Sequence, residues 1–140
     1  MTGEERRNAV AGWQEASSVA LDSAKVLLER GDARGCINRA YYAAYQAGTS
    51  ACLAHKDEDL FAHGWRNPSH DQLPDLIHNN GDFPIADRAR LRFLLSILRR
   101  ARETADYRPG QSIEMVDAVR VVQHAVMVLE LLGVQERENA

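Results

Sequence analysis

Arginine and tyrosine side chains are concentrated in the alanine-rich stretch NRAYYAAYQAG, residues 38–48. If this stretch is helical, Arg39 and Tyr42 are neighbours on one face because they lie three residues apart. Tyr41 and Tyr45 lie four residues apart and form a second pair. Tyrosine rings fill core space while their hydroxyls reach a polar partner. The pattern therefore favours a packed face that also carries polar, cationic chemistry.

A second group of arginines lies on one face of a later predicted helix. Asp106 shares a sector of about 80° on the helical wheel with Arg88, Arg92, Arg99 and Arg102. Only Glu103 and Asp106 supply nearby acids, so two interpretations stay open: a solvated face, or a surface that binds phosphate or carboxylate groups. Because a buried, unpaired arginine is costly, we also expect Asp106 to pair with Arg39 across two helices.

The histidines could act as acids or bases near neutral pH. Arg66 and His70 lie in the segment RNPSH, where Pro68 disfavours helix and could let both side chains approach one phosphate. The alternative is that His70 caps or packs against the helix that it precedes. Arg120 and His124 have the same spacing within an apolar helix. The spacings of His55, His63 and His78 match no compact metal motif, so we expect neither a metal nor a cofactor.

Helical periodicity extends along almost the whole chain. It predicts long helices over 4–29, 33–54 and 85–105, a short helix from Ser69 or Asp71 to residue 77, and a last helix that Ser112 caps and that ends near residue 132. Gly31 suits a left-handed turn, Asp32 suits a helix cap, and Pro109 stops a helix. The expected fold is all-α, an up-and-down antiparallel bundle of four long helices plus one short helix.

Composition narrows the class of protein. The 140 residues are expected to form one domain over 1–140, with a core over about 10–133 and a charged tail over 134–140. A net charge of −3 argues against a general polyanion binder, so any contact with nucleic acid must be local. Cys36 and Cys52 are expected to be buried thiols. With no apolar leader and no apolar span of membrane length, we expect a cytoplasmic protein without membrane contact.

Two motifs in order carry a resemblance to a known family. The segments RAYYA, at 39–43, and RETADY, at 102–107, resemble the HEPN domains, in particular the prokaryotic branch with RAYYA and RxxADY motifs. The resemblance covers about residues 10–133. It implies a bundle of four or five helices, which is often dimeric in this family, and binding of nucleotides or RNA at the positions Arg39, Tyr42, Arg99, Arg102, Asp106 and Tyr107.

The resemblance implies several functions. Such domains are frequently partners of nucleotidyltransferases in toxin–antitoxin or defence systems, where some bind without catalysis. Others are metal-independent ribonucleases, with an arginine and a histidine separated by four to six residues. Arg66 and His70 have only three residues between them, so this chain departs from that pattern. We therefore expect a non-catalytic or weakly catalytic module. A ribonuclease using Arg66 and His70, or a helical assembly protein that binds an acidic partner, remain the alternatives.

Overall fold

The fold is described from a computed structural model, in which residues 2–54, 69–79 and 83–137 are described. These residues form helices α1 (Gly3–Glu29), α2 (Ala33–Ala54), α4 (Leu73–His78), α5 (Ile85–Tyr107) and α6 (Met115–Leu132). The all-α prediction is confirmed, and the predicted bounds of the long helices agree with the structure to within a few residues. The short helix begins later than predicted, because residues 69–72 form a turn in which Ser69 Oγ accepts a hydrogen bond from the Gln72 backbone amide at 3.2 Å.

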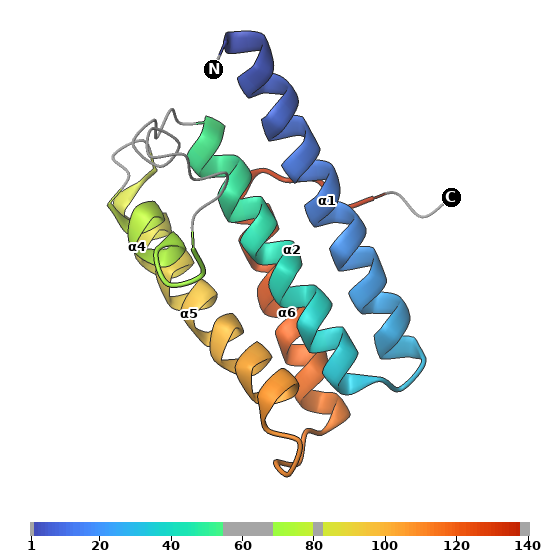
Figure 1. Cartoon of the computed structure of the whole chain (residues 1–140). Coiled ribbons are helices and arrows are strands. Elements are labelled where there is room, and N and C mark those ends of the chain that lie inside the picture. Colours follow the sequence, from blue (N-terminus) through green and yellow to red (C-terminus); the bar gives the residue numbers. More distant parts are fainter. Residues whose placement is uncertain (1, 55–68, 80–82, 138–140) are drawn as a thin grey trace.

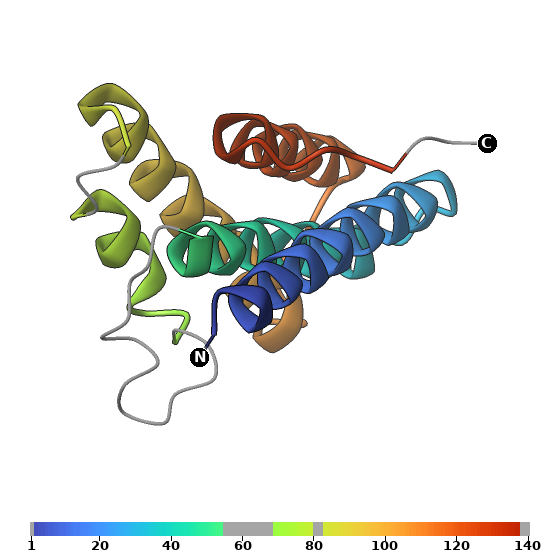
Figure 2. The same ribbon diagram turned by 90° about the horizontal axis from the view of Figure 1, so that it is seen from above.

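The four long helices alternate in direction, as expected for an up-and-down bundle. In Figure 1, α1 and α5 run downward while α2 and α6 run upward. Figure 2 shows α2 in the middle of the bundle, and α2 contacts each of the other helices. The short helix α4 lies against α5 and α2. Among the described helices, α2 therefore shares an interface with each of the others.

The turn between α1 and α2 follows the predicted chemistry. Gly31 has φ of +81°, in the left-handed region that glycine adopts without steric cost. The Asp32 carboxylate accepts a hydrogen bond from the Gly35 backbone amide at 2.8 Å, which satisfies one of the free amides at the start of α2. The two helices consequently reverse direction within a very short connection.

Small residues let α2 occupy the centre of the bundle. Ala40, Ala43, Ala44 and Ala47 are fully buried, and the buried hydroxyl of Ser17 donates a 2.6 Å hydrogen bond from α1 to the Ala43 carbonyl. A Cβ atom added at Gly48 would lie 2.8 Å from the Leu73 side chain, so this glycine allows α4 to approach α2 closely. Residues without bulky side chains therefore set the distance between these helices.

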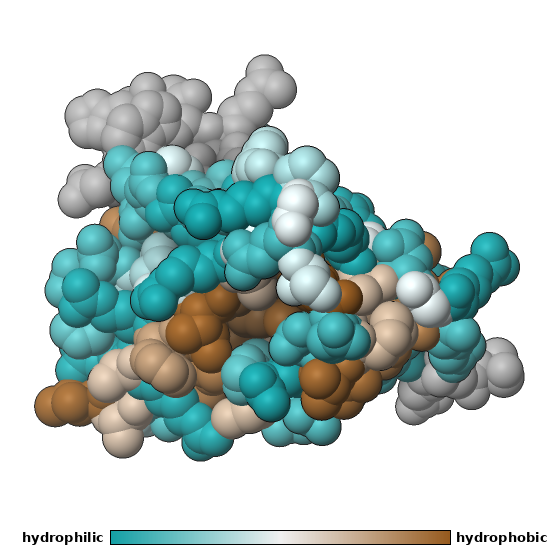
Figure 3. All heavy atoms as spheres, turned by 90° about the horizontal axis from the view of Figure 1, so that it is seen from below, coloured by the Kyte–Doolittle hydropathy of each residue, from teal (hydrophilic) through white to brown (hydrophobic). Residues whose placement is uncertain are grey.

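A groove of about 380 Å³ opens between α5 and α6. Figure 3 views the molecule from the end with the α5–α6 connection and shows hydrophobic surface around a hollow. Ile97 and Ala101 of α5 and Val121 of α6 supply apolar lining, while Arg120 and His124 add polar groups. Burial, together with the positive charge of Arg120, lowers the pKa of His124. The second arginine–histidine pair thus lies in a groove rather than in the core.

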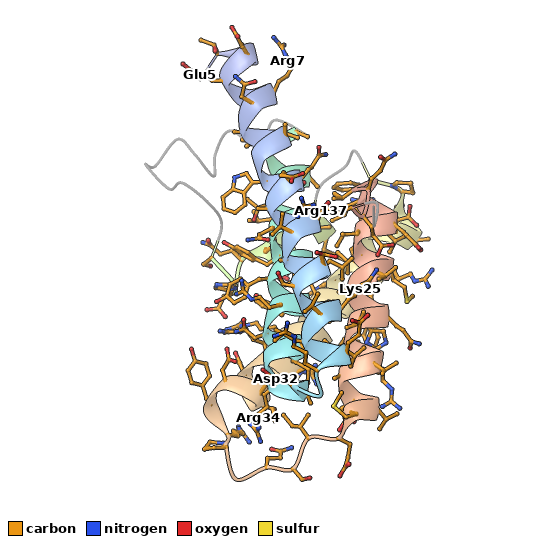
Figure 4. The ribbon with its side chains drawn as sticks, turned by 90° about the vertical axis from the view of Figure 1, so that its right-hand side faces the viewer. Glu5, Arg7, Lys25, Asp32, Arg34 and Arg137 are labelled. Carbon is orange, nitrogen blue, oxygen red and sulfur yellow. The ribbon has the colours of Figure 1, made fainter. Side chains whose placement is uncertain are left out.

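Arg34 joins the start of α2 to the connection after α5. Its guanidinium donates hydrogen bonds to backbone carbonyls of Ala105 at 2.9 Å and Arg108 at 3.2 Å, and also to those of Thr104, Pro109 and Gln111. Figure 4 shows Arg34 at this end of the bundle. A cation here satisfies carbonyls that a helix C-terminus leaves unpaired.

The start of α6 differs from the prediction. Ser112 does not cap this helix; Glu114 is the N-cap, and its side chain and that of Asp117 exchange hydrogen bonds with each other's backbone amides. The helix starts later because residues 109–112 are needed to turn the chain below Arg34, where Gln111 contributes its carbonyl. Acidic side chains also suit this position, because the N-terminus of a helix carries partial positive charge.

Two further expectations concern the cysteines and membranes. Cys36 and Cys52 are both buried thiols that take part in no disulfide, as predicted. Among the described residues, the helices are all too short or too polar to cross a bilayer.

Candidate functional site

Three tyrosines of α2 surround His70, which lies in the turn that leads into α4. The Tyr41 hydroxyl lies 2.5 Å from His70 Nδ1. The Tyr45 ring stacks on the imidazole, with centroids 4.4 Å apart and an interplanar angle of 26°. Tyr42 meets the imidazole edge to face at 5.8 Å. His70 therefore packs on aromatic rings of α2, and not on the helix that it precedes, as the alternative drawn from the sequence had it.

The packing of α4 on α2 brings His70 to these rings. Leu73 and Ile77 of α4 are buried against α2 near Gly48. Since His70 lies one turn before Leu73, this packing places the imidazole over the neighbouring part of α2. Burial lowers the pKa of His70, as do the positive charges of Arg102 and Arg99, whereas Asp71 opposes the shift. The ring is accordingly biased toward its neutral form near pH 7.

Arg102 of α5 completes the cluster. Its guanidinium carbon lies 5.2 Å from the Tyr41 ring centroid, 5.9 Å from that of Tyr42 and 5.6 Å from that of Tyr107. A guanidinium this close to an aromatic face gains cation–π attraction. The side chain is only 11% exposed, and no described residue accepts a hydrogen bond from its buried Nε. We call Tyr41, Tyr42, Tyr45, His70, Arg102 and Tyr107 the aromatic–arginine cluster.

The predicted ion pair between Arg39 and Asp106 is not present. Asp106 instead accepts a 3.0 Å hydrogen bond from Asn38 Nδ2 and pairs with Arg102 at 3.5 Å. Arg39 Nε donates to Asn38 Oδ1 at 2.9 Å, and its guanidinium lies 5.0 Å from the Tyr42 ring centroid. The two helices do meet here as predicted, but Asn38 stands between the arginine and the carboxylate. The amide can do this because it donates through one atom and accepts through the other.

Two arginines of α5, Arg92 and Arg99, form ion pairs with acidic residues on the segment around α4. Arg99 forms ion pairs with Asp71 and, at 3.2 Å, with Glu103. Arg92 pairs with Asp75 of α4 at 3.1 Å. Arg92 and Arg99 thus join α5 to the segment around α4 through ion pairs. Their side chains are partly exposed, so each pair contributes modestly to stability.

The structure brings together most of the predicted site residues. Tyr42, Arg102, Tyr107 and His70 lie in the cluster, and Arg39 and Asp106 border it. Arg99 lies close enough to influence the His70 pKa but is engaged by Asp71. Arg66 lies outside the described residues.

Sequence reasoning missed two roles in this region. Asn38 was not considered, although a polar amide one residue before Arg39 is the signal that could have indicated it. Tyr41 was noted without a role in the site. Burial raises the pKa of the Tyr41 phenol, so its hydroxyl retains the proton. Tyr107, by contrast, is 69% exposed and presents a ring to solvent beside Arg102.

The cluster combines a nearly buried guanidinium, aromatic faces and an imidazole. Guanidinium groups bind phosphate oxygens, and aromatic faces stack on nucleobases. In the described ranges, His, Cys, Asp and Glu side chains form no group of three that could hold a metal ion. The residues at this site therefore suit an anionic, ring-bearing ligand.

Comparison with protein families relates the chain to a known domain. The family model of the HEPN domain matches residues 10–137, nearly the whole chain. A search of curated proteins gave no significant match.

Proposed function

Because this chain belongs to the HEPN domain family, we propose that it binds nucleotides or RNA at the aromatic–arginine cluster without depending on catalysis. Membership in the family makes the chain a helical module related to nucleotides and RNA. The observation that supports this site is the position of Arg102, whose guanidinium lies near the rings of three tyrosines. Two of these rings, those of Tyr41 and Tyr42, also contact His70.

The exposure of the cluster suits a ligand that enters from one side. Tyr107 offers an exposed ring for stacking, while Arg102 lies deeper and is only 11% exposed. A base stacked on Tyr107 would place its phosphate near the guanidinium, whose Nε has no acceptor among the described residues. Such a site recognises one or a few nucleotides. A local site of this kind is compatible with the net charge of −3.

A metal-independent endoribonuclease is the second candidate. It is favoured by the position of His70 beside Arg102 and Arg99, since a histidine and positive charge can serve proton transfer and phosphorane stabilisation. Two observations weigh against it. The spacing from Arg66 to His70 is too short for the ribonuclease motif. In addition, one ring nitrogen of His70, Nδ1, is already hydrogen-bonded to the Tyr41 hydroxyl.

The biological setting that we propose comes from the family resemblance. The module would act as a homodimer beside a nucleotidyltransferase in a toxin–antitoxin or defence system. Co-expression with a nucleotidyltransferase encoded next to it, followed by affinity purification of one component, tests this partnership. Recovery of a stable complex would support it, and recovery of the module alone would argue against it.

The proposed site is tested by fluorescence anisotropy with short labelled single-stranded RNA in EDTA. We expect Arg102→Gln to weaken binding about 10- to 100-fold, because a hydrogen bond from a charged group contributes about 1.5–3 kcal/mol. Arg100→Gln is the matched control, since Arg100 is exposed on the same helix. It should change affinity about twofold at most, as expected for one exposed charge.

Three outcomes decide between the candidates. Equal binding by wild type and a folded Arg102→Gln variant would remove the cluster from the proposal. Absence of binding to RNA, AMP and ATP would contradict the function itself. Cleavage of the RNA in EDTA, lost in His70→Ala, would establish the ribonuclease in its place.

A further inference from the structure

We propose that Tyr41 is a positioning residue that donates its hydroxyl proton to His70 Nδ1, so that His70 offers Nε2–H as a hydrogen-bond donor to an anionic ligand. The choice of an anionic ligand rests on the proposed function, whereas the assignment of the His70 proton to Nε2 does not depend on it. The inference makes the phosphate group, rather than the base or sugar, the part of the ligand that this side of the site recognises.

The first step concerns the Tyr41 hydroxyl. Tyr41 is 2% exposed, and His70 Nδ1, at 2.5 Å, is the hydrogen-bond partner of its hydroxyl within the described part of the chain. A buried hydroxyl proton needs an acceptor. If Nδ1 carried a proton and donated to the phenol oxygen, the phenol proton would lose this acceptor, at a typical cost of about 1–3 kcal/mol. Donation from Tyr41 to Nδ1 satisfies both groups.

The second step concerns the protonation states. Burial raises the pKa of Tyr41, so the phenol keeps its proton for donation. The groups that face His70 are Tyr41, Tyr42, Tyr45, Arg102 and Arg99, with Asp71 next to it in the chain. Burial and the two arginines lower the His70 pKa despite Asp71. A neutral imidazole carries one proton, and with Nδ1 accepting, that proton must be on Nε2.

The third step concerns the direction of the ring. Tyr45 stacks on one face of the imidazole with centroids 4.4 Å apart, and the Tyr41 hydrogen bond fixes the Nδ1 edge. The stacking contact fixes the plane of the imidazole ring, and the hydrogen bond fixes how the ring is oriented within that plane. No described residue forms a hydrogen bond with Nε2, which lies on the opposite side of the ring from the carbon that bears the side chain. Nε2–H is thereby left for a ligand.

This arrangement is the reverse of one that makes histidine a base. When a carboxylate accepts a hydrogen bond from Nδ1–H, the neutral ring carries its proton on Nδ1, and the unprotonated Nε2 can accept a proton. A tyrosine that donates to Nδ1 leaves Nε2 as a donor. Together, Arg102 and His70 then present only donors, which suits phosphate oxygens. Activation of an RNA hydroxyl by His70 would first require its tautomer to change, which further weakens the ribonuclease candidate.

The tautomer is observed directly in ¹⁵N-histidine-labelled protein by long-range ¹H–¹⁵N correlation spectra, without any ligand. We expect wild-type His70 to be protonated at Nε2 near pH 7. In Tyr41→Phe, we expect a mixture of tautomers and a higher His70 pKa, because the lost hydrogen bond stabilised the neutral ring. His124, which lies in the α5–α6 groove, serves as the internal control and should not change.

Ligand binding is then measured by calorimetry with AMP and with adenosine, which lacks the phosphate. We expect wild type to bind AMP at least about 10-fold more tightly than adenosine. Tyr41→Phe should bind AMP severalfold more weakly than wild type does, while its affinity for adenosine stays unchanged.

A wild-type His70 protonated at Nδ1 would overturn the inference, and this result needs no variant to fold. An unchanged tautomer and pKa in folded Tyr41→Phe would also overturn it. Equal affinity for AMP and adenosine would overturn the choice of phosphate. If the tautomer is as expected but neither AMP nor RNA binds, the proposed function fails while the role of Tyr41 in positioning His70 stands.

Discussion

Asn38 Nδ2 lies 3.0 Å from Asp106 Oδ2, and this hydrogen bond joins the first half of α2 to the last turn of α5. The same Asp106 oxygen pairs with Arg102. The side-chain oxygen of Asn38, Oδ1, accepts a hydrogen bond from Arg39 Nε. One amide and one carboxylate thus connect the two arginines that border the tyrosine rings. Their arrangement determines how Arg102 is held over the cluster.

We expect Asp106→Ala to destabilise the protein by about 1–2 kcal/mol, at the low end for a hydrogen bond to a charged group. The cost is limited because the Asp106 side chain is 24% exposed and water can replace its partners. Urea unfolding of Asp106→Ala, Asn38→Ala and the double variant measures the coupling. Strictly additive effects of the two substitutions would show that the hydrogen bond contributes nothing to stability.

Arg34 should contribute more to stability than Arg92 or Arg99, whose ion pairs are partly exposed. Arg34→Ala removes a donor to several carbonyls at the end of α5, and we expect a loss of about 2–3 kcal/mol. Arg34→Lys should recover less than half, because one ammonium cannot reproduce the planar fork. Arg30→Ala is the control, since Arg30 is exposed nearby. Thermal and urea unfolding measure these losses. Equal losses of stability in Arg34→Ala and Arg30→Ala would contradict this role of Arg34.

The lowered pKa of His70 makes its contribution to stability depend on pH. Below the pKa of an unfolded histidine, about 6.5, the unfolded chain binds a proton that folded His70 resists, so the folded state loses stability as pH falls. We expect the stability lead of wild type over His70→Gln to shrink between pH 7.5 and pH 5.5, a range of about two units around that value. Urea unfolding across this range measures the difference in unfolding free energy between wild type and His70→Gln. Because both proteins contain His124, its contribution cancels in this difference. A lead that is constant or grows on acidification would exclude this explanation.

Gly48 sets the distance between α2 and the helix that positions His70. A Cβ at this position would lie 2.8 Å from Leu73 Cδ2 and 3.2 Å from Ile77 Cδ1. Gly48→Ala gains about 1 kcal/mol of helix propensity, which offsets the cost of shifting the Leu73 side chain. Gly48→Leu cannot be accommodated in this way, and we expect it to cost about 3 kcal/mol or more. If unfolding experiments show that both variants are as stable as wild type, α4 does not pack as described.

The helices could be predicted from sequence because their signals are local. Apolar periodicity, Gly31 and Pro109 act within a few residues of their position, and α1, α2 and α5 begin and end close to where these signals indicated. The start of α6 was misplaced because Ser112 and Glu114 both have side chains that can cap a helix. The competition was decided by the position of the turn held by Arg34, which is a long-range contact.

The candidate site was predicted only in part, for the same reason. The two motifs correctly indicated that α2 meets the end of α5. Sequence could not show that Asn38 would separate Arg39 from Asp106, because side-chain length and helix rotation decide this over 68 residues of chain. Nor could it assign Asp71 and Asp75 to Arg99 and Arg92, since these pairs depend on how α4 packs against α5.

The binding site itself is tested most directly by NMR titration of the wild-type protein with short single-stranded RNA, following the imidazole carbon-bound proton resonances of His70 and His124. We expect the His70 signal to shift and saturate while the His124 signal stays in place, because only His70 belongs to the aromatic–arginine cluster. An unmoved His70 signal at saturating RNA, with shifts at His124 instead, would place the ligand in the α5–α6 groove and contradict the site described above.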